Sequence, residues 1–140
     1  MIHLLRVIFA FLLIYVGWGS LAHDPQAPEE SSVFFQWLSS LLFGSHAYED
    51  KLLHFFAYGA LGVSGALARL PVLGSTWILF AGLAAYGTGL EGLQALGGVR
   101  SGDWLDIVAN IAGGACGVFG IWVLSVLAEM IFNRAKRLPS

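Results

Sequence analysis

Residues 103–117, DWLDIVANIAGGACG, place a polar stripe and a glycine-rich stripe on the same helical face. Asp103, Asp106 and Asn110 recur three and four residues apart, which is the spacing of one face of an α-helix. The glycines that follow, among them Gly117, continue this face, and small residues at such intervals are typical of helices that pack closely in lipid. The stretch therefore predicts a membrane helix with polar side chains at one end and a helix contact in its middle.

The composition of the whole chain is that of a membrane protein. Of its 140 residues, 57% are hydrophobic and only 11% are charged, about half the charged fraction of a soluble domain. The formal net charge of −2 provides no basic surface, so the sequence excludes nucleic acid as a partner. The single cysteine, Cys116, allows neither a disulfide within the chain nor a cysteine-rich metal site, and we expect no cofactor.

Four stretches are apolar enough to cross a hydrocarbon layer, which requires a helix of about 20 residues. They are residues 2–21, 52–70, 73–96 and 107–131. All 4 prolines lie outside these stretches. The expected fold class is all-α, a polytopic membrane protein with four transmembrane helices in one bundle, and residues 1–140 form a single domain.

The first stretch has a second interpretation. Arg6 precedes an apolar run, and Ser20 and Ala22 form the small-x-small pattern found at the cleavage site of a secretion signal. Retention of the stretch gives a regular bundle of four helices, whereas cleavage leaves an odd number of spans. The sequence leaves both possibilities open.

The distribution of positive charge predicts the orientation of the bundle. The inner cations for a cytoplasmic N-terminus are Arg6, Arg69, Arg134, Lys136 and Arg137, and Glu129 is the one acid on that side. The outer side then carries the remaining eight of the 9 acids but only Lys51 and Arg100 of the 7 cations. Because loops rich in Lys and Arg stay in the cytoplasm, both termini are expected there.

Residues 33–43, between the first two stretches, are almost entirely aromatic or leucine. The segment is too short to span a bilayer. Ser31 or Ser32 can cap its start and Gly44 can end it, so we expect a short helix on the outer side. This helix lies either in the headgroup layer or packed over the end of the bundle.

The second stretch begins with a polar face. Asp50, His54 and Tyr58 follow one another at intervals of four residues, and Lys51 lies on the same side of the helix. In the structural interpretation, Asp50 caps the helix and His54 is a buried core histidine. In the functional one, Asp50 orients His54 for proton transfer. Asp103 and Asp106 likewise have the spacing of a capping box.

Glu91 and Gln94 lie near the outer end of the third stretch. The helix dipole disfavours a carboxylate near a C-terminal end, so Glu91 needs a partner. Arg100 and Lys51 are the cations available on that side. Glu91 is then either one half of a structural ion pair or a group that handles a ligand or a proton.

Together these residues resemble the VanZ-like family. The pattern runs Asp50-Lys51-x-x-His54-Phe55-x-x-Tyr58, then Glu91-x-x-Gln94, then Arg100-x-x-Asp103-x-x-Asp106-x-x-x-Asn110-x-x-Gly113. The resemblance covers roughly residues 50–120. It implies a small polytopic protein of the bacterial cytoplasmic membrane, in a family named for a member associated with teicoplanin resistance. It implies no particular reaction.

Two functions are consistent with the pattern. In the first, an outward-facing site acts on or binds a lipid-linked or anionic substrate of the cell envelope. The expected catalytic residues are His54, Glu91, Asp106 and Asp50, and the expected substrate-binding residues are Lys51, Tyr58, Gln94, Arg100, Asp103 and Asn110. In the second, the ion network is structural, and the protein binds membrane lipid or assists transport, as a homodimer or with an envelope protein partner. No ligand spacing selects a metal.

Overall fold

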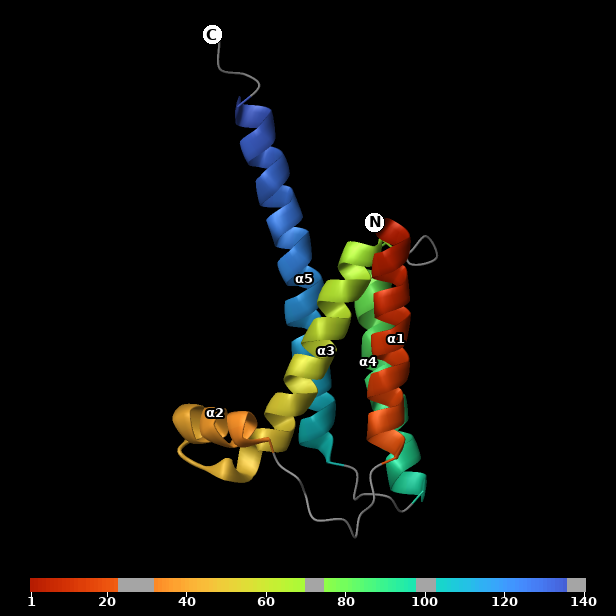
Figure 1. Cartoon of the computed structure of the whole chain (residues 1–140), viewed down its shortest axis with the longest axis vertical. Helices are drawn as coiled ribbons and strands as arrows, with labels where there is room; N and C mark the ends of the chain where they lie inside the picture. The colour runs from red at the N-terminus through yellow and green to blue at the C-terminus, as the bar shows by residue number, and fades with distance from the viewer. Residues whose placement is uncertain (23–31, 70–74, 98–102, 136–140) are drawn as a thin grey trace.

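The computed structural model describes residues 1–22, 32–69, 75–97 and 103–135, and all regular structure in these ranges is helical. The helices are α1 (Ile2–Leu21), α2 (Val33–Phe43), the 3₁₀ turn η1 (His46–Tyr48), α3 (Glu49–Ala68), α4 (Thr76–Gly97) and α5 (Trp104–Ala135) (Figure 1). The all-α expectation is confirmed for this part of the chain.

Three helical segments among the described residues are long and apolar enough to cross a membrane. They are Ile2–Leu21, His46–Ala68 and Trp104–Arg134. α4 has 22 residues but is not among them, since Glu91, Gln94 and several glycines interrupt its apolar sequence. The helices indicate a membrane protein with three candidate spans, and the fourth span stays a prediction.

α3 and α5 cross in close contact, and glycines make the crossing possible (Figure 1). A Cβ atom added at Gly113 would collide with the backbone carbonyl of Phe55, and one added at Gly117 would collide with the carbonyl oxygen of Gly59. The two backbones therefore approach as in other membrane helix pairs built on small residues. This crossing brings the first turns of α3 beside the first turns of α5.

α1 is tied to the rest of the bundle at both of its ends. Tyr86 and Gln94 of α4 each donate a hydrogen bond of 2.6 Å to α1, to the carbonyl oxygen of Leu13 in its middle and of Ser20 near its C-terminal end respectively. Near its N-terminal end, Arg6 donates to the carbonyl oxygens of the two residues that end α3, at 3.3 and 3.2 Å. These contacts are those of an integral helix of the bundle.

The apolar core lies between α1, α3, α4 and the first half of α5. It contains Phe9, Tyr58, Leu61, Ala68, Leu79, Leu83 and Val118. Gly65 on α3 leaves room for the ring of Phe9, because a Cβ atom there would lie 2.8 Å from that ring. α1 thus contributes to the core as well as to the polar contacts.

α2 lies across the end of α3 (Figure 1). Gly44 ends it with φ +67°, a left-handed conformation that glycine adopts without steric cost. Ser39 then fixes the following turn: its Oγ donates to the carbonyl oxygen of Ser45 at 2.6 Å and accepts from the backbone N–H of Tyr48 at 3.3 Å. Trp37 is exposed. The predicted helix is present, and its placement in a headgroup layer stays a prediction.

α5 is much longer than its neighbours. Its 32 residues make a helix of about 48 Å. The C-terminal part extends past the other helices at the end of the molecule where the N-terminus lies, opposite α2 (Figure 1). Leu124, Ile131 and Phe132 are exposed on this extension.

Candidate functional site

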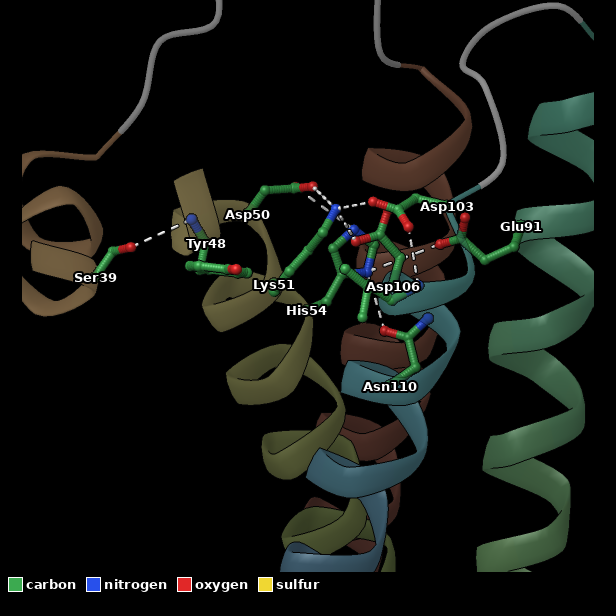
Figure 2. Close-up of polar contacts among 10 residues, drawn as sticks. Ser39, Tyr48, Asp50, Lys51, His54, Glu91, Asp103, Asp106 and Asn110 are labelled. Carbon is green, nitrogen blue, oxygen red and sulfur yellow. Dashed lines mark hydrogen bonds and ion pairs between the residues drawn. The ribbon is translucent and has the colours of Figure 1, made fainter. Parts of the chain in front are cut away.

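Polar side chains from three helices meet at the end of the bundle where α3 and α5 begin (Figure 2). The cluster consists of Asp50, Lys51 and His54 from α3, Glu91 from α4, Asp103 just before α5, and Asp106 and Asn110 from α5. Seven of the ten residues expected to form a site are therefore together. The expected side chains of α3 share one face, as their four-residue spacing predicts.

Lys51 lies among three carboxylates. Its Nζ atom is 2.6 Å from Asp103 Oδ2, 2.6 Å from Asp106 Oδ1 and 3.2 Å from Asp50 Oδ2. An ammonium group has three hydrogens to donate, so these contacts match its donor capacity. Lys51 thus joins α3 to α5, and its immediate surroundings are those of a lysine in an ion network rather than of a lysine open to an anion.

His54 is oriented by α5. Its Nδ1 atom lies 2.9 Å from Asn110 Oδ1. Because an amide oxygen only accepts, Nδ1 carries the hydrogen and donates it. Nε2 is 3.7 Å from Asp50 Oδ1, one helical turn away. Asn110 therefore has the orienting role that the sequence suggested for Asp50, while Asp50 faces the other ring nitrogen.

Two carboxylates of the cluster are deeply buried. Asp106 is 1% exposed and Glu91 is 4% exposed. The sequence suggested Lys51 or Arg100 as the partner of Glu91. In the structure, Glu91 Oε1 faces His54 Nδ1 at 3.9 Å, and the ion pairs of Lys51 among the described residues are with aspartates. Arg100 lies outside the described residues.

Asp103 both caps a helix and belongs to the cluster. Its Oδ1 accepts a hydrogen bond of 2.9 Å from the backbone N–H of Leu105, while Oδ2 pairs with Lys51. The capping and ion-pair interpretations of this residue are therefore compatible. Its carboxylate serves the end of α5 with one oxygen and the ion network with the other.

Tyr58 and Gln94 lie beside the cluster rather than in its ion pairs. Tyr58 is 1% exposed, and its hydroxyl has no hydrogen-bond partner among the described residues. Gln94 is buried and directs its Nε2 to the carbonyl oxygen of Ser20 on α1. The structure thus uses Gln94 in a helix contact, and Tyr58 presents a buried hydroxyl one turn below His54.

The sequence did not single out Ser39 or Tyr48, which connect α2 to the start of α3 (Figure 2). A serine inside an apolar segment was a signal for this, because a hydroxyl on a short helix commonly bonds a nearby backbone group. This connection fixes α2 next to the residues that precede Asp50.

The cluster has the parts required for proton transfer and for cation binding. The imidazole of His54 is a group that can accept or donate a proton, and the carboxylates of Asp50 and Glu91 lie 3.7 and 3.9 Å from its ring nitrogens. Asp50, His54 and Asp106 each offer one ligand atom, and these three atoms lie within 4.8 Å of one another. Comparisons of the chain with protein-family models, curated proteins and solved structures found no match.

Proposed function

We propose that the protein is a VanZ-like integral protein of the bacterial cytoplasmic membrane, linked to glycopeptide (teicoplanin) susceptibility through the cell envelope. In this proposal the polar cluster acts on or binds a lipid-linked envelope substrate at the outer leaflet. The resemblance of the three motifs supports the family. The main support for a site is the environment of His54: Asn110 orients its ring, and the carboxylates of Asp50 and Glu91 face its two nitrogens.

The proposed topology has four spans, with α4 as the fourth and both termini in the cytoplasm. α4 supports this because its length of 22 residues matches a bilayer and its polar residues are buried. Arg6 lies against the end of α3 that carries Arg69, whereas the aspartates lie at the opposite end. This separation of charge agrees with a cytoplasmic side rich in arginine.

α2 is proposed to lie in the outer headgroup layer. Its crosswise orientation, its lack of charged residues and its exposed aromatic side chains support this (Figure 1). An apolar helix in this position would be stabilised by burial in the boundary between headgroups and acyl chains. It would hold the cluster next to the lipid that carries the substrate.

In the proposed mechanism, His54 is the general base or acid, and Glu91 is the second proton-handling group. Asn110 positions the imidazole, while Lys51 and Asp103 hold α3 and α5 in register. General acid–base catalysis by one positioned group contributes about 10²- to 10⁴-fold in rate. Removal of His54 should therefore abolish the phenotype without removing the fold.

The test is complementation of a deletion strain with His54→Gln and Glu91→Gln. Membrane abundance, teicoplanin susceptibility, and the pools of lipids and peptidoglycan precursors are compared with those for the wild-type protein. Ser125→Ala is the matched control, because this exposed hydroxyl donates to the carbonyl of Ile121 in its own helix, far from the cluster. Full complementation by the two site variants at normal abundance would refute the proposal.

The second candidate is a non-catalytic protein with a structural ion network. The three carboxylates around Lys51 favour it. The combined variant Lys51→Asp with Asp103→Lys separates the candidates. A structural network predicts that the reversal restores both abundance and phenotype relative to each single variant. A reacting site predicts that abundance returns while the phenotype does not.

A further inference from the structure

The negative charge of the cluster exceeds its positive charge. Four carboxylates face Lys51 and His54 among the described residues: Asp50, Glu91, Asp103 and Asp106. Even a full positive charge from Arg100 would leave four carboxylates facing two permanent cations. Buried carboxylates are costly unless a cation or a proton compensates them, and two of these four are almost fully buried.

The geometry of His54 leaves one nitrogen lone pair directed into the cluster. Nδ1 donates its hydrogen to Asn110, so the neutral imidazole has a bare Nε2. Nε2 faces Asp50 Oδ1 at 3.7 Å, and both of these atoms are acceptors. Metal-binding histidines characteristically donate their other N–H to a carbonyl or carboxylate oxygen, as His54 does to Asn110.

Asp106 offers a further open acceptor. Its carboxylate is 1% exposed, and Oδ1 forms the ion pair with Lys51. Oδ2 is buried without a hydrogen-bond partner among the described residues. A buried carboxylate oxygen left in this way calls for a water or an ion as its partner.

We propose that Asp50, His54 and Asp106 bind one divalent transition-metal ion, in the class from Mn²⁺ to Zn²⁺. Two ligand atoms at about 2.1 Å from one ion lie at most about 4.2 Å apart. The Nε2 to Oδ1 distance of 3.7 Å meets this limit. The 4.8 Å spread of the three ligand atoms requires side-chain shifts of about 0.6 Å if the two farthest ligands lie opposite each other, and about 1.4 Å in a tetrahedral site, where ligand atoms lie about 3.4 Å apart. One imidazole with two carboxylates favours these metals over Mg²⁺ and Ca²⁺, which prefer oxygen ligands alone.

This site goes beyond the proposed function and changes one role in it. With Nδ1 bonded to Asn110 and Nε2 on the ion, His54 acts as a metal ligand, and Glu91 remains the proton-handling group. The site also bears on the substrate. With Lys51 surrounded by carboxylates, the described part of the cluster presents excess negative charge to a headgroup. A bound divalent ion would supply the positive charge that an anionic headgroup requires. Lys51 would remain on Asp106 Oδ1, while Oδ2 serves the ion.

The test uses the full chain, stripped with a chelator and reconstituted in nanodiscs, and titrated separately with Mn²⁺, Co²⁺ and Zn²⁺. We expect one ion per chain, and an electron spin-echo signal from ¹⁴N when Mn²⁺ is bound, because one ligand is an imidazole. The variants Asp50→Asn, His54→Gln and Asp106→Asn should each lower the affinity at least 10-fold. Asn110→Ala should lower it about 10- to 100-fold through loss of the orienting hydrogen bond.

Glu129→Gln is the matched control, since it removes an exposed acid from the extension of α5. Its affinity should equal that of the wild-type protein. Circular dichroism and elution from a sizing column check the fold of each variant, and the spin-echo signal needs only the wild-type chain. The proposal fails if the folded wild-type protein binds no ion at a 1:1 ratio, or binds one without ¹⁴N coupling. It also fails if the three ligand variants, folded, retain full affinity.

Metal binding is measured without substrate, so the two proposals fail separately. Metal binding by the wild-type protein, together with unchanged teicoplanin susceptibility in the His54→Gln strain, would refute the proposed function alone. Loss of the phenotype in that strain, combined with no metal binding by the wild-type protein, would refute the metal site alone.

Discussion

His54 Nδ1 lies 2.9 Å from Asn110 Oδ1, a hydrogen bond between residues 56 positions apart in the chain. It links the first turns of α3 and α5 at the point where α4 contributes Glu91. The ring orientation of His54, and with it the direction of Nε2, therefore depends on the packing of two helices.

Replacement of Asn110 by Leu should release the imidazole. We expect the free energy of unfolding to fall by about 1–3 kcal/mol, because the buried Nδ1–H loses its acceptor. ¹⁵N spectra of histidine-labelled protein in nanodiscs should change from one tautomer to a mixture at His54. The signal of His54 is assigned as the one that is missing from the His54→Gln spectrum. Asn110→Asp, which keeps an acceptor, is the control. An unchanged tautomer in the leucine variant would contradict this assignment.

The close crossing of α3 and α5 makes a sharp prediction about two glycines one turn apart. Gly117→Ala places a methyl group against the carbonyl of Gly59 and should lower the melting temperature in detergent. Gly120→Ala meets nothing within 4 Å and should leave it unchanged or raise it, since alanine favours a helix by about 1 kcal/mol over glycine. Equal shifts for the two variants would be evidence against the crossing.

The two aspartates that share Lys51 should differ in their contribution to stability. Asp106→Asn should cost about 3–5 kcal/mol, because it breaks an ion pair at a residue that is 1% exposed. Asp103→Asn should cost about 1 kcal/mol, since this side chain is 34% exposed and its amide oxygen can still cap α5. Reversible unfolding in mixed micelles measures both. A larger loss for Asp103→Asn would show that Lys51 depends mainly on the outer carboxylate.

The contacts of α1 predict that this helix is retained in the mature protein. Cleavage after it would remove the carbonyls that accept hydrogen bonds from Tyr86 and Gln94. It would also remove the guanidinium of Arg6, which donates to a carbonyl at the end of α3. We expect an N-terminal epitope tag to persist on the purified protein, with the full mass in a mass spectrum. A C-terminal tag on the same chain is the control. Recovery of only a shortened, folded chain would support the secretion-signal interpretation instead.

Cysteine labelling tests the proposed orientation. Cys116, the one native cysteine, is first replaced by Ala. Ser32→Cys, just before α2, should then react with an impermeant maleimide on intact cells. Asn133→Cys, exposed near the end of α5, should react only after the membrane is permeabilised. The reverse pattern would place the polar cluster on the cytoplasmic side.

Much of the local structure was predictable from the sequence. The bounds of α1 and α2 equal those expected from apolar length, and α2 ends at Gly44 as expected. Of the two serines expected to cap α2, Ser32 occupies the N-cap position, but its side chain makes no capping hydrogen bond. The polar residues of α3 and α5 fall on the faces that their spacing indicates, because this follows from helix geometry alone. α5 is longer than residues 107–131, since its polar first turn and its last turns are helical beyond the apolar run.

The partners within the site were less predictable. Side chains on one helix are placed by periodicity, but pairing between helices depends on their rotation and separation, which here are fixed by glycine contacts. Lys51 therefore pairs with Asp103 and Asp106 rather than with Glu91. The contact of Gln94 with α1 could not be inferred either, because it depends on the relative depth of two separate helices.

In the proposed topology, the length of α5 would give the bilayer a mechanical influence on the site. A helix of about 48 Å exceeds a hydrocarbon layer of about 30 Å, and such helices adapt to thinner or thicker membranes by tilting. Because glycine contacts lock α3 to α5, neither helix can lean without the other. In the proposed topology, the depth of His54 beneath the lipid surface would be coupled to membrane thickness, so acyl-chain length would act on the site through the two helices.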